Sequence, residues 1–344
     1  MQNQGEWFDG FIERKIDIRR SLSYCGDRAK ELSKLGGVPN LLRDWPVEEC
    51  KRAFDQAQPF RHVIIDQFLA DEFCQALLAE FPAFDEKQAL NEMGLVGAKA
   101  VVERLQQIGP AYRQFDQLIQ SPEFLAKIEA ITGIPRLLYD PHYFGGGTHE
   151  NRHGQDLDIH VDFNYHPKTQ SHRRLNLIVF LNPQWEAGWG GCLELHRDPW
   201  GPAADDQTVS VVPLLNRCVI FETTESSWHG FRRIQLPDPS LSRRSLAIYF
   251  YTAERPAAET APAHSTIYVP WRMPEHLQAG HTLTEADVEA LDEQFGRRDE
   301  LVRFLYEREK EFTEFRDTLL SSPSFKLARM LMTPARILKR MLKS

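Results

Sequence analysis

The segment LDIHVDF, residues 157–163, places a histidine and an aspartate two positions apart in a run of strand-forming residues. In a strand, residues i and i+2 point to the same face, so His160 and Asp162 would direct a nitrogen and a carboxylate oxygen to one point. A histidine from another strand would complete a two-histidine, one-carboxylate face, which leaves three adjacent positions of an octahedral Fe(II) open. His-x-Asp alone is a weak signal, because it also arises by chance or as a structural hydrogen-bonded pair.

Two later segments supply residues for the rest of such a site. His229, in WHGFRR, follows the apolar strand candidate RCVIFE and is the candidate third ligand, with a buried structural histidine as the alternative. The segment SRRSLAIYFYT, residues 242–252, then places two arginines at the start of the last strand candidate. A five-carbon dicarboxylate that chelates iron requires a cation for its far carboxylate, and arginine offers a bidentate fork for it.

The two arginines are neighbours on one strand and must therefore point to opposite faces. Arg243 shares its face with Ser245, whose hydroxyl can donate a further hydrogen bond, and then with residues that suit a lined cavity. Arg244 shares its face with apolar residues that suit contact with covering helices. Arg243 with Ser245 is the expected anchor of the far carboxylate, and Arg244 replaces it if the strand register slips by one residue.

Short strand candidates must position these residues, and they follow one another at close intervals from about residue 136. They are rich in β-branched and aromatic residues and are separated by Gly, Pro, Asn or Asp, which predicts a sandwich or barrel and not a βαβ sheet. After Thr252 we expect no further strand. Tyr143 and Asn176 lie on strand candidates that should line the cavity, so both are candidate co-substrate contacts, with packing as the alternative.

Helices are expected on either side of this β-rich region. HVIID at 62–66 is a short strand candidate, and the stretch from about 84 to 135 is expected to be largely helical. Within it, SPEFLAKIEAITG has Ser121 as N-cap, proline at the first helical position and glycine after the end. Thr284 and Asp287 form a capping box that opens a second helical region.

Together, these motifs resemble a known family. The order His-x-Asp, WGGCLEL at residues 189–195, a lone histidine and Arg-x-Ser is similar to the prolyl-4-hydroxylase-like branch of the 2-oxoglutarate/Fe(II)-dependent oxygenase superfamily. The resemblance covers about residues 60–255. It implies a mainly β core with flanking helices, arranged as a double-stranded β-helix, or jelly roll.

The resemblance also implies cofactors and roles. His160, Asp162 and His229 would bind Fe(II), and Arg243 with Ser245 would hold 2-oxoglutarate. O2 is the other co-substrate, and ascorbate is a candidate reductant. The implied reaction is hydroxylation of an unactivated C–H bond of an unidentified substrate, with release of succinate and CO2. Two alternatives remain open: a catalytically inactive jelly-roll binding or scaffold protein, and a cupin-like metal enzyme that does not use 2-oxoglutarate.

Three regions are expected: a helical N-terminal extension at 1–57, the oxygenase domain at 58–255, and a helical C-terminal extension at 256–344. The last 21 residues, 324–344, hold six basic and no acidic side chains beside an apolar face. Their two interpretations are a solvated or protein-docked helix and a peripheral contact with anionic lipid. SPSFKLARMLMTPARILKR also weakly resembles tails of bacterial cell-surface polysaccharide enzymes, so a saccharide joins small molecules and peptides as candidate substrates.

Composition argues against other classes of function. The net charge of −8 gives no overall attraction to nucleic acid. No apolar run approaches the ~18 residues that cross a bilayer, and the N-terminus lacks the apolar core of a signal peptide. The cytoplasm is therefore the expected location, with the tail as the candidate contact to the inner face of the membrane. The sequence does not predict the oligomeric state.

Overall fold

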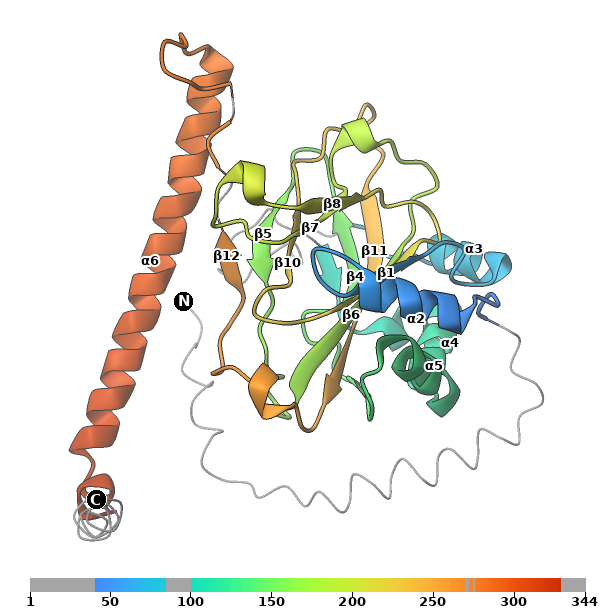
Figure 1. Cartoon of the computed structure of the whole chain (residues 1–344), viewed down its shortest axis with the longest axis horizontal. Coiled ribbons are helices and arrows are strands. Elements are labelled where there is room, and N and C mark those ends of the chain that lie inside the picture. Colours follow the sequence, from blue (N-terminus) through green and yellow to red (C-terminus); the bar gives the residue numbers. More distant parts are fainter. Residues whose placement is uncertain (1–40, 85–99, 270–271, 275, 329–344) are drawn as a thin grey trace. The chain divides into compact units, whose positions relative to one another are not determined.

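The computed structural model describes residues 41–84, 100–269, 272–274 and 276–328. The chain divides into two units, Met1–Arg43 and Asp44–Ser344, and almost all described residues belong to the second. Within that second unit, the described strands form one seven-stranded and one five-stranded sheet (Figure 1). Every strand pair in both sheets is antiparallel.

The larger sheet has the strand order β1-β9-β6-β11-β4-β2, and β3 also pairs with β11. Its strands are β1 (His62–Ile65), β2 (Ala100–Val102), β3 (Leu138–Tyr139), β4 (Gly147–Asn151), β6 (His172–Phe180), β9 (Cys218–Glu222) and β11 (Arg243–Thr252). The smaller sheet has the order β12-β5-β10-β7-β8. Its strands are β5 (Leu157–Val161), β7 (Leu193–His196), β8 (Thr208–Val211), β10 (Trp228–Phe231) and β12 (Ile267–Val269).

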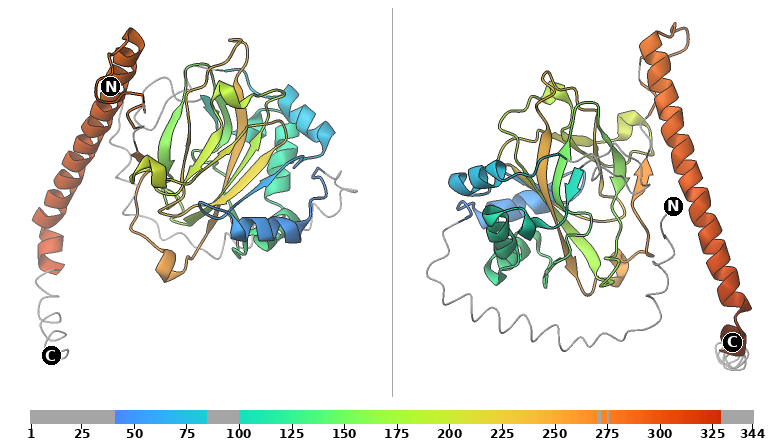
Figure 2. Two further views of the ribbon diagram at one scale, coloured as in Figure 1. Left: turned by 45° about the horizontal axis from the view of Figure 1, so that its top comes forward. Right: turned by 180° about the vertical axis from the view of Figure 1, so that it is seen from behind.

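Helices cover the outer face of the larger sheet, as the views of Figure 2 show. They are α2 (Val47–Gln56), α3 (Asp71–Ala79), α4 (Pro110–Ile119) and α5 (Pro122–Thr132), with short 3-10 turns at Leu105–Gln107, Ala187–Trp189, Ala203–Asp205 and Ala257–Glu259. The signals expected for α5 are present: the Ser121 hydroxyl accepts from the Phe124 amide, and Gly133 ends the helix at φ +70°. Phe124 packs against Phe250 of β11, which seats α5 on the sheet.

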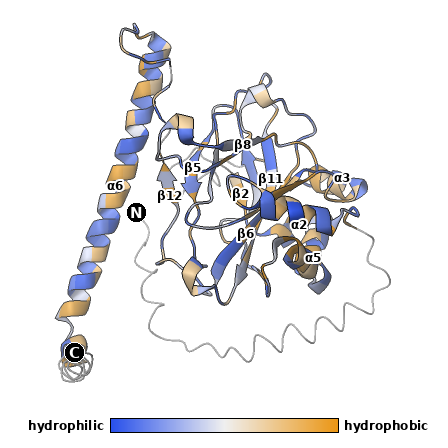
Figure 3. Ribbon diagram, in the orientation of Figure 1, coloured by the Kyte–Doolittle hydropathy of each residue, from blue (hydrophilic) through white to orange (hydrophobic). Residues whose placement is uncertain are grey.

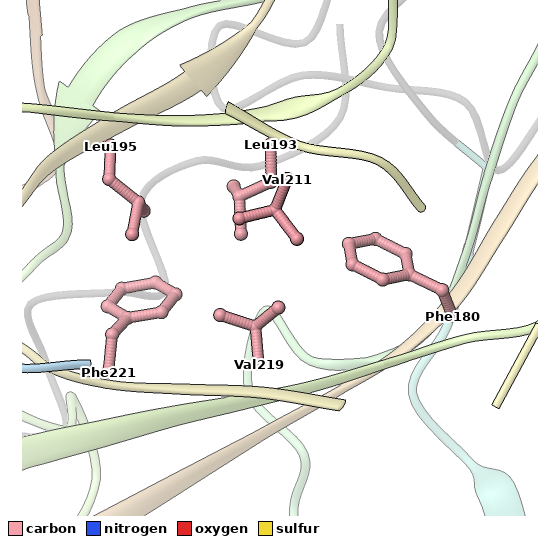
Figure 4. Packing of buried hydrophobic residues seen from close by; sticks show 6 residues of the cluster. All are labelled: Phe180, Leu193, Leu195, Val211, Val219 and Phe221. Carbon is pink, nitrogen blue, oxygen red and sulfur yellow. The ribbon is translucent and has the colours of Figure 1, made fainter. Parts of the chain in front are cut away.

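The apolar core lies between the two sheets. Both sheets contribute to one cluster, drawn in Figure 4: Phe180, Leu193, Leu195, Val211, Val219 and Phe221. Each of these side chains is at most 3% exposed, so together they exclude water from the space between the sheets. Two facing antiparallel sheets with helices on one side make the predicted jelly roll, and the expected fold class is confirmed.

One expectation about strand positions was wrong, and another omitted a short strand. The strands do not stop at Thr252, because β12 adds an edge to the smaller sheet and pairs with β5. Residues 85–99 lie outside the described part, and 100–135 is largely helical as expected, although β2 also pairs with β4 there. Both strands have three residues, too few to display the alternation that marks a strand in a sequence.

The C-terminal region is dominated by α6 (Glu285–Ser321). It begins with the expected capping box, in which Thr284 and Asp287 exchange hydrogen bonds. Of the expected N-terminal extension, 1–57, only 41–57 is described, and of the basic tail only 324–328. None of the helices in the described ranges combines the length and the hydropathy that a bilayer crossing requires.

Candidate metal centre

Two neighbouring strands of the smaller sheet bring the candidate ligands together. His160 on β5 and His229 on β10 are direct cross-strand partners, so their side chains leave the sheet side by side. Asp162 follows one residue after the end of β5. The ligand atoms of all three residues lie within 4.8 Å of one another. The structure therefore places on one point the residues that the His-x-Asp motif and the later histidine singled out.

Backbone carbonyls fix which nitrogen of each histidine faces this point. His160 Nδ1 lies 2.8 Å from the carbonyl oxygen of Asp158, and His229 Nδ1 lies 2.9 Å from that of Ser227. Because a carbonyl only accepts, each Nδ1 must carry the hydrogen, which leaves the lone pair on Nε2. Both Nε2 atoms face the carboxylate of Asp162. The local backbone thus fixes Nε2 of each imidazole as the atom offered to a metal.

The spacing of the donor atoms suits a cation. His160 Nε2 is 3.8 Å from Asp162 Oδ1, and His229 Nε2 is 3.5 Å from Asp162 Oδ2. These separations are longer than hydrogen bonds. They are slightly longer than the roughly 3 Å between neighbouring ligand atoms around an octahedral cation with bonds of about 2.1 Å. Two imidazoles and a carboxylate with open positions beside them are the donor set of non-haem Fe(II), so the residues present fit that metal.

A buried cation and an amide hold Asp162 in place. Arg173 on β6, 1% exposed, forms an ion pair with Asp162 Oδ2 at 3.1 Å. Asn176 donates to the same oxygen at 2.8 Å and accepts from Arg173. Burial by itself raises the pKa of Asp162, but Arg173, followed by the two histidines and Asn176, holds the pKa below its ordinary value. The carboxylate is therefore ionised and fixed in orientation.

A β-bulge explains how Arg173 and Asn176 reach the same carboxylate. Residues three apart on a regular strand point to opposite faces. The pairing of β6 with β11 shifts register at this point, because Phe250 pairs with Leu175 whereas Tyr251 pairs with Arg173. The extra residue, Arg174, turns to the outer face and pairs with Glu222. Sequence reasoning missed Arg173 because the alternation rule assigns it to the wrong face.

Arg243, at the start of β11, lies between the sheets and is 4% exposed. Its guanidinium stacks on Phe231, two residues beyond His229, and on Phe180, and its Nε donates to the carbonyl of Gly191 at 2.6 Å. No carboxylate of the described residues lies within ion-pair distance of it. Burial lowers the pKa of Arg243 to about 10, with only Cys192 acting in the opposite direction. A buried guanidinium without a carboxylate is costly unless an anion completes it.

The neighbours of Arg243 on β11 lie as their faces predict. Ser245 is 1% exposed and sits opposite Phe180 of β6, on the face of Arg243. Arg244 points to the other face, where it pairs with Glu150 and lies over the ring of Phe81. Arg244 therefore contacts the helical side of the sheet, and the structure does not bring it to the interior.

The glycine pair in WGGCLEL forms the backbone segment that contacts the Arg243 side chain. Gly190 and Gly191 have φ values of +69° and +66°, a region that other residues seldom adopt. A Cβ on Gly191 would lie 2.8 Å from the Trp185 ring and 3.2 Å from the Arg243 side chain. Only glycine thus permits the backbone to approach the guanidinium and offer it a carbonyl.

The remaining candidates differ from expectation. Tyr143 is not on a strand: it lies in a turn at φ +50°, and its hydroxyl donates to Asp116 of α4, which ties it to the helical layer. The sequence around it, DPHYFGGG, contains the proline and glycines of a turn, and that signal outweighs its aromatic residues. Asn176 is on a strand as expected, but it contacts Asp162. Tyr268 of β12 was missed entirely, although it pairs with His160 and its ring lies 5.4 Å from the imidazole.

A second group of two histidines and one aspartate occurs at the start of α6. His276 and His281 direct Nε2 to the two oxygens of Asp287, at 2.7 and 3.0 Å. These are hydrogen-bond distances. Asp287 also accepts from the amide and the hydroxyl of Thr284, so its oxygens are already used in capping the helix.

A family model matches the part of the chain that contains this centre. Residues 146–251 match the family model described as the 2OG-Fe(II) oxygenase superfamily. The matched segment contains His160, Asp162, His229 and Arg243. Residues 146–251 are thus similar to the 2-oxoglutarate/Fe(II) oxygenase superfamily, and the resemblance recognised in the sequence is confirmed. No curated protein matches the chain.

Several solved structures are similar to parts of the chain. A prolyl 4-hydroxylase from Phytophthora capsici is 18% identical, with 86% of this chain and 98% of that chain covered and a TM-score of 0.42. A prolyl-4-hydroxylase from Pseudomonas putida is 15% identical, with 64% and 100% covered and a TM-score of 0.39. A prolyl hydroxylase from Trichoplax adhaerens, in complex with a hypoxia inducible factor peptide fragment, is 13% identical, with 67% and 93% covered and a TM-score of 0.41.

Proposed function

We propose that this chain is an Fe(II)- and 2-oxoglutarate-dependent dioxygenase that hydroxylates an unactivated C–H bond and releases succinate and CO2. His160, Asp162 and His229 are its iron ligands. Arg243, with Ser245 beside it, holds the far carboxylate of 2-oxoglutarate. The observation that carries the proposal is the buried guanidinium of Arg243, which has no carboxylate of the described residues within ion-pair distance. It lies over the ring of Phe231, two residues beyond the candidate iron ligand His229 on β10.

The bound iron, with 2-oxoglutarate and O2, supplies the oxidising chemistry. The chain's own residues do the rest. His160 and His229 offer Nε2 because backbone carbonyls hold their Nδ1 hydrogens. Arg173 and Asn176 keep Asp162 ionised and oriented. Arg243 orients the co-substrate through a charge-assisted fork, and Ser245 can donate its hydroxyl hydrogen to the same carboxylate. The packed sheets exclude water from these groups.

The two alternatives predict different arrangements. A cupin-like enzyme that does not use 2-oxoglutarate has no need of a buried arginine without a carboxylate partner between its sheets. An inactive scaffold has no need of backbone carbonyls that fix both imidazoles as ligands, or of Arg173 beside Asp162. Arg243 favours the 2-oxoglutarate enzyme over the first alternative, and the prepared ligands favour it over the second.

Succinate release tests the proposal. Purified full-length protein, supplied with Fe(II), 2-oxoglutarate and air, should convert 2-oxoglutarate slowly to succinate even without its true substrate. Ascorbate should sustain this turnover by keeping the iron reduced. The Arg243→Ala variant is the matched control and should be slower at limiting 2-oxoglutarate. Wild-type protein that binds iron yet releases no succinate would favour the inactive scaffold.

The same readout can find the substrate. Small molecules, saccharides and peptides, added to the anaerobic complex before O2, should leave succinate release unchanged unless one is the substrate. A substrate should accelerate it and gain the mass of one oxygen atom. Accelerated release with loss of two hydrogens instead would replace hydroxylation by desaturation.

A further inference from the structure

Helix α6 carries apolar side chains that the described part of the chain leaves exposed. Phe295 and Phe312 are 60% and 67% exposed. Figure 3 shows hydrophobic residues recurring along α6 among hydrophilic ones. Six of these exposed residues follow one another at spacings of three or seven residues: Val288, Phe295, Val302, Leu305, Phe312 and Leu319. An exposed stripe of this kind marks an interaction surface.

The spacing is that of a coiled coil. If Val288 is an a position, the a and d positions of the five heptads from Val288 to Leu319 hold seven apolar residues and three charged ones, Arg298, Glu309 and Arg316. We call these ten positions the α6 seam. On a straight helix, positions that repeat every seven residues shift gradually around the helix axis. They form a continuous contact surface only when the helix supercoils around a partner helix. With 37 residues, α6 extends for about 55 Å, long enough for such pairing.

The seam is separate from the residues that attach α6 to the jelly roll. Arg297 donates to both carboxylate oxygens of Asp156, at 2.7 and 3.0 Å, and Arg308 donates to Ser265. Neither arginine is an a or d position. Attachment to the jelly roll and pairing along the seam can therefore occur together.

We propose that the seam binds the seam of a second copy of this chain, in antiparallel orientation. In an antiparallel pair, each a residue lies beside a d residue of the other helix. The reason is that the spacing from a to d is three residues and that from d to the next a is four, and the two spacings occur in the opposite order on the reversed helix. One register then matches the whole seam with itself. It pairs Val302 with Leu305, Phe295 with Phe312, and Val288 with Leu319. Leu291 meets Arg316, whose aliphatic stem can cover a leucine while its charge reaches solvent.

Charge selects the antiparallel orientation. In this register Arg298 of one copy meets Glu309 of the other, twice in each dimer, and neither residue has an ion-pair partner within the described part of its own chain. A parallel pair would instead place arginine beside arginine and glutamate beside glutamate, which is unfavourable. The seam is therefore complementary to itself only when the two helices run in opposite directions.

A membrane is a poorer occupant for this helix. Residues 285–317 carry twelve acidic and six basic side chains. Helices that lie on anionic membranes have basic polar faces, whereas this one would be repelled.

Sedimentation of the full-length protein tests the proposal. Wild-type protein should be a dimer that dissociates on dilution. Phe295→Glu combined with Phe312→Glu should give a monomer with unchanged helix content by circular dichroism and unchanged iron binding. Glu300→Arg, a charge reversal on the opposite side of α6, should remain a dimer. A monomeric wild type, including one that binds anionic vesicles, would overturn the proposal.

A charge exchange tests the orientation. Arg298→Glu should weaken the dimer by at least about tenfold, because it faces Glu309 of the other copy with like charge. Adding Glu309→Arg to the same chain should restore wild-type affinity. A disulfide should form when Phe295→Cys protein is mixed with Phe312→Cys protein, and not within either protein alone. No loss in the single variant, or cross-linking of Phe295→Cys with itself, would contradict the antiparallel seam.

Discussion

Within the residues that the structure describes, two histidines and one aspartate come together in two places, on the β5–β10 pair and at the start of α6. On the strands, both Nε2 atoms stand 3.5–3.8 Å from the Asp162 oxygens. At the helix, both Nε2 atoms are within 3.0 Å of the Asp287 oxygens. The donor types are identical, but the first set leaves room for a cation and the second is closed by its own hydrogen bonds.

The difference lies in what holds each donor. On the strands, backbone carbonyls accept the Nδ1 hydrogens of both histidines, and Arg173 pairs with one oxygen of Asp162. The Nε2 lone pairs and the carboxylate therefore face one point without forming hydrogen bonds to one another. At the helix, Asp287 caps the first turn, and the histidines satisfy the carboxylate directly. The amino end of a helix also carries positive partial charge, which disfavours a metal ion there. Two histidines and one aspartate therefore form a metal site only when other groups prevent them from forming hydrogen bonds to one another.

The largest expected effect follows from deleting one histidine of each cluster. His229→Ala should weaken Fe(II) or Co(II) binding by more than roughly 100-fold, since even the loss of a group that merely orients a ligand costs 10–100-fold. His281→Ala should leave metal affinity unchanged. Isothermal titration calorimetry under anaerobic conditions measures both. Equal losses in the two variants would remove the distinction between the clusters.

A second comparison concerns the neighbouring arginines of β11. Arg243→Ala should raise the Michaelis constant for 2-oxoglutarate by roughly 30-fold or more, because a buried charge contact is worth on the order of 2–5 kcal/mol. Arg244→Ala should mainly lower the melting temperature, since it removes the contacts to Glu150 and Phe81. Initial rates of succinate release decide between them. The reverse pattern would mean that the co-substrate lies on the other face of β11.

A smaller effect is expected for the amide that orients Asp162. Asn176→Ala should weaken metal binding by roughly 10–100-fold, the usual cost of losing a group that holds a ligand. Asn182→Ala is the matched control, because it removes buried hydrogen bonds to the backbone of Pro213 and Arg244, and neither bond involves a candidate metal ligand. It should lose stability but keep metal affinity. Unchanged affinity in Asn176→Ala would show that Arg173 alone suffices.

The smallest effect is expected at Asp287. Asp287→Ala should lower the melting temperature by about 2–4 °C, as loss of a helix cap does, and leave bound metal unchanged. Hydrogen bonds from His276 and then His281 lower the pKa of Asp287. Its stabilising effect is therefore complete above about pH 4 and is lost as the pH falls through the lowered pKa. Calorimetric scans of both proteins should differ at neutral pH and converge in strong acid.

The fold and the three clustered residues could be anticipated because they depend on local rules. Alternation of side chains placed His160 and Asp162 on one face, and short strands between turn residues indicated a sandwich or barrel. The same alternation distinguished Arg243 from Arg244. Each of these inferences requires only the period of a strand and the chemistry of one or two side chains.

The rest depended on pairings that no local pattern records. Arg173 reaches Asp162 because a bulge at Arg174 reverses the faces of β6. Tyr268 lies beside His160 because a three-residue edge strand joins the smaller sheet. Tyr143 was misassigned because a turn with positive φ took the place of a strand. Register shifts and edge pairings are decided by tertiary contacts, so a single sequence contains little signal for them.

One anaerobic titration tests the central claim most directly. Full-length protein should bind one Fe(II) per chain, and adding 2-oxoglutarate should produce the visible absorption band of the Fe(II)–2-oxoglutarate chelate. The band should disappear in His229→Ala, require much more 2-oxoglutarate in Arg243→Ala, and persist unchanged in His281→Ala. No band in the wild type, or a band retained in His229→Ala and lost in His281→Ala, would contradict the assignment of the metal centre to β5 and β10.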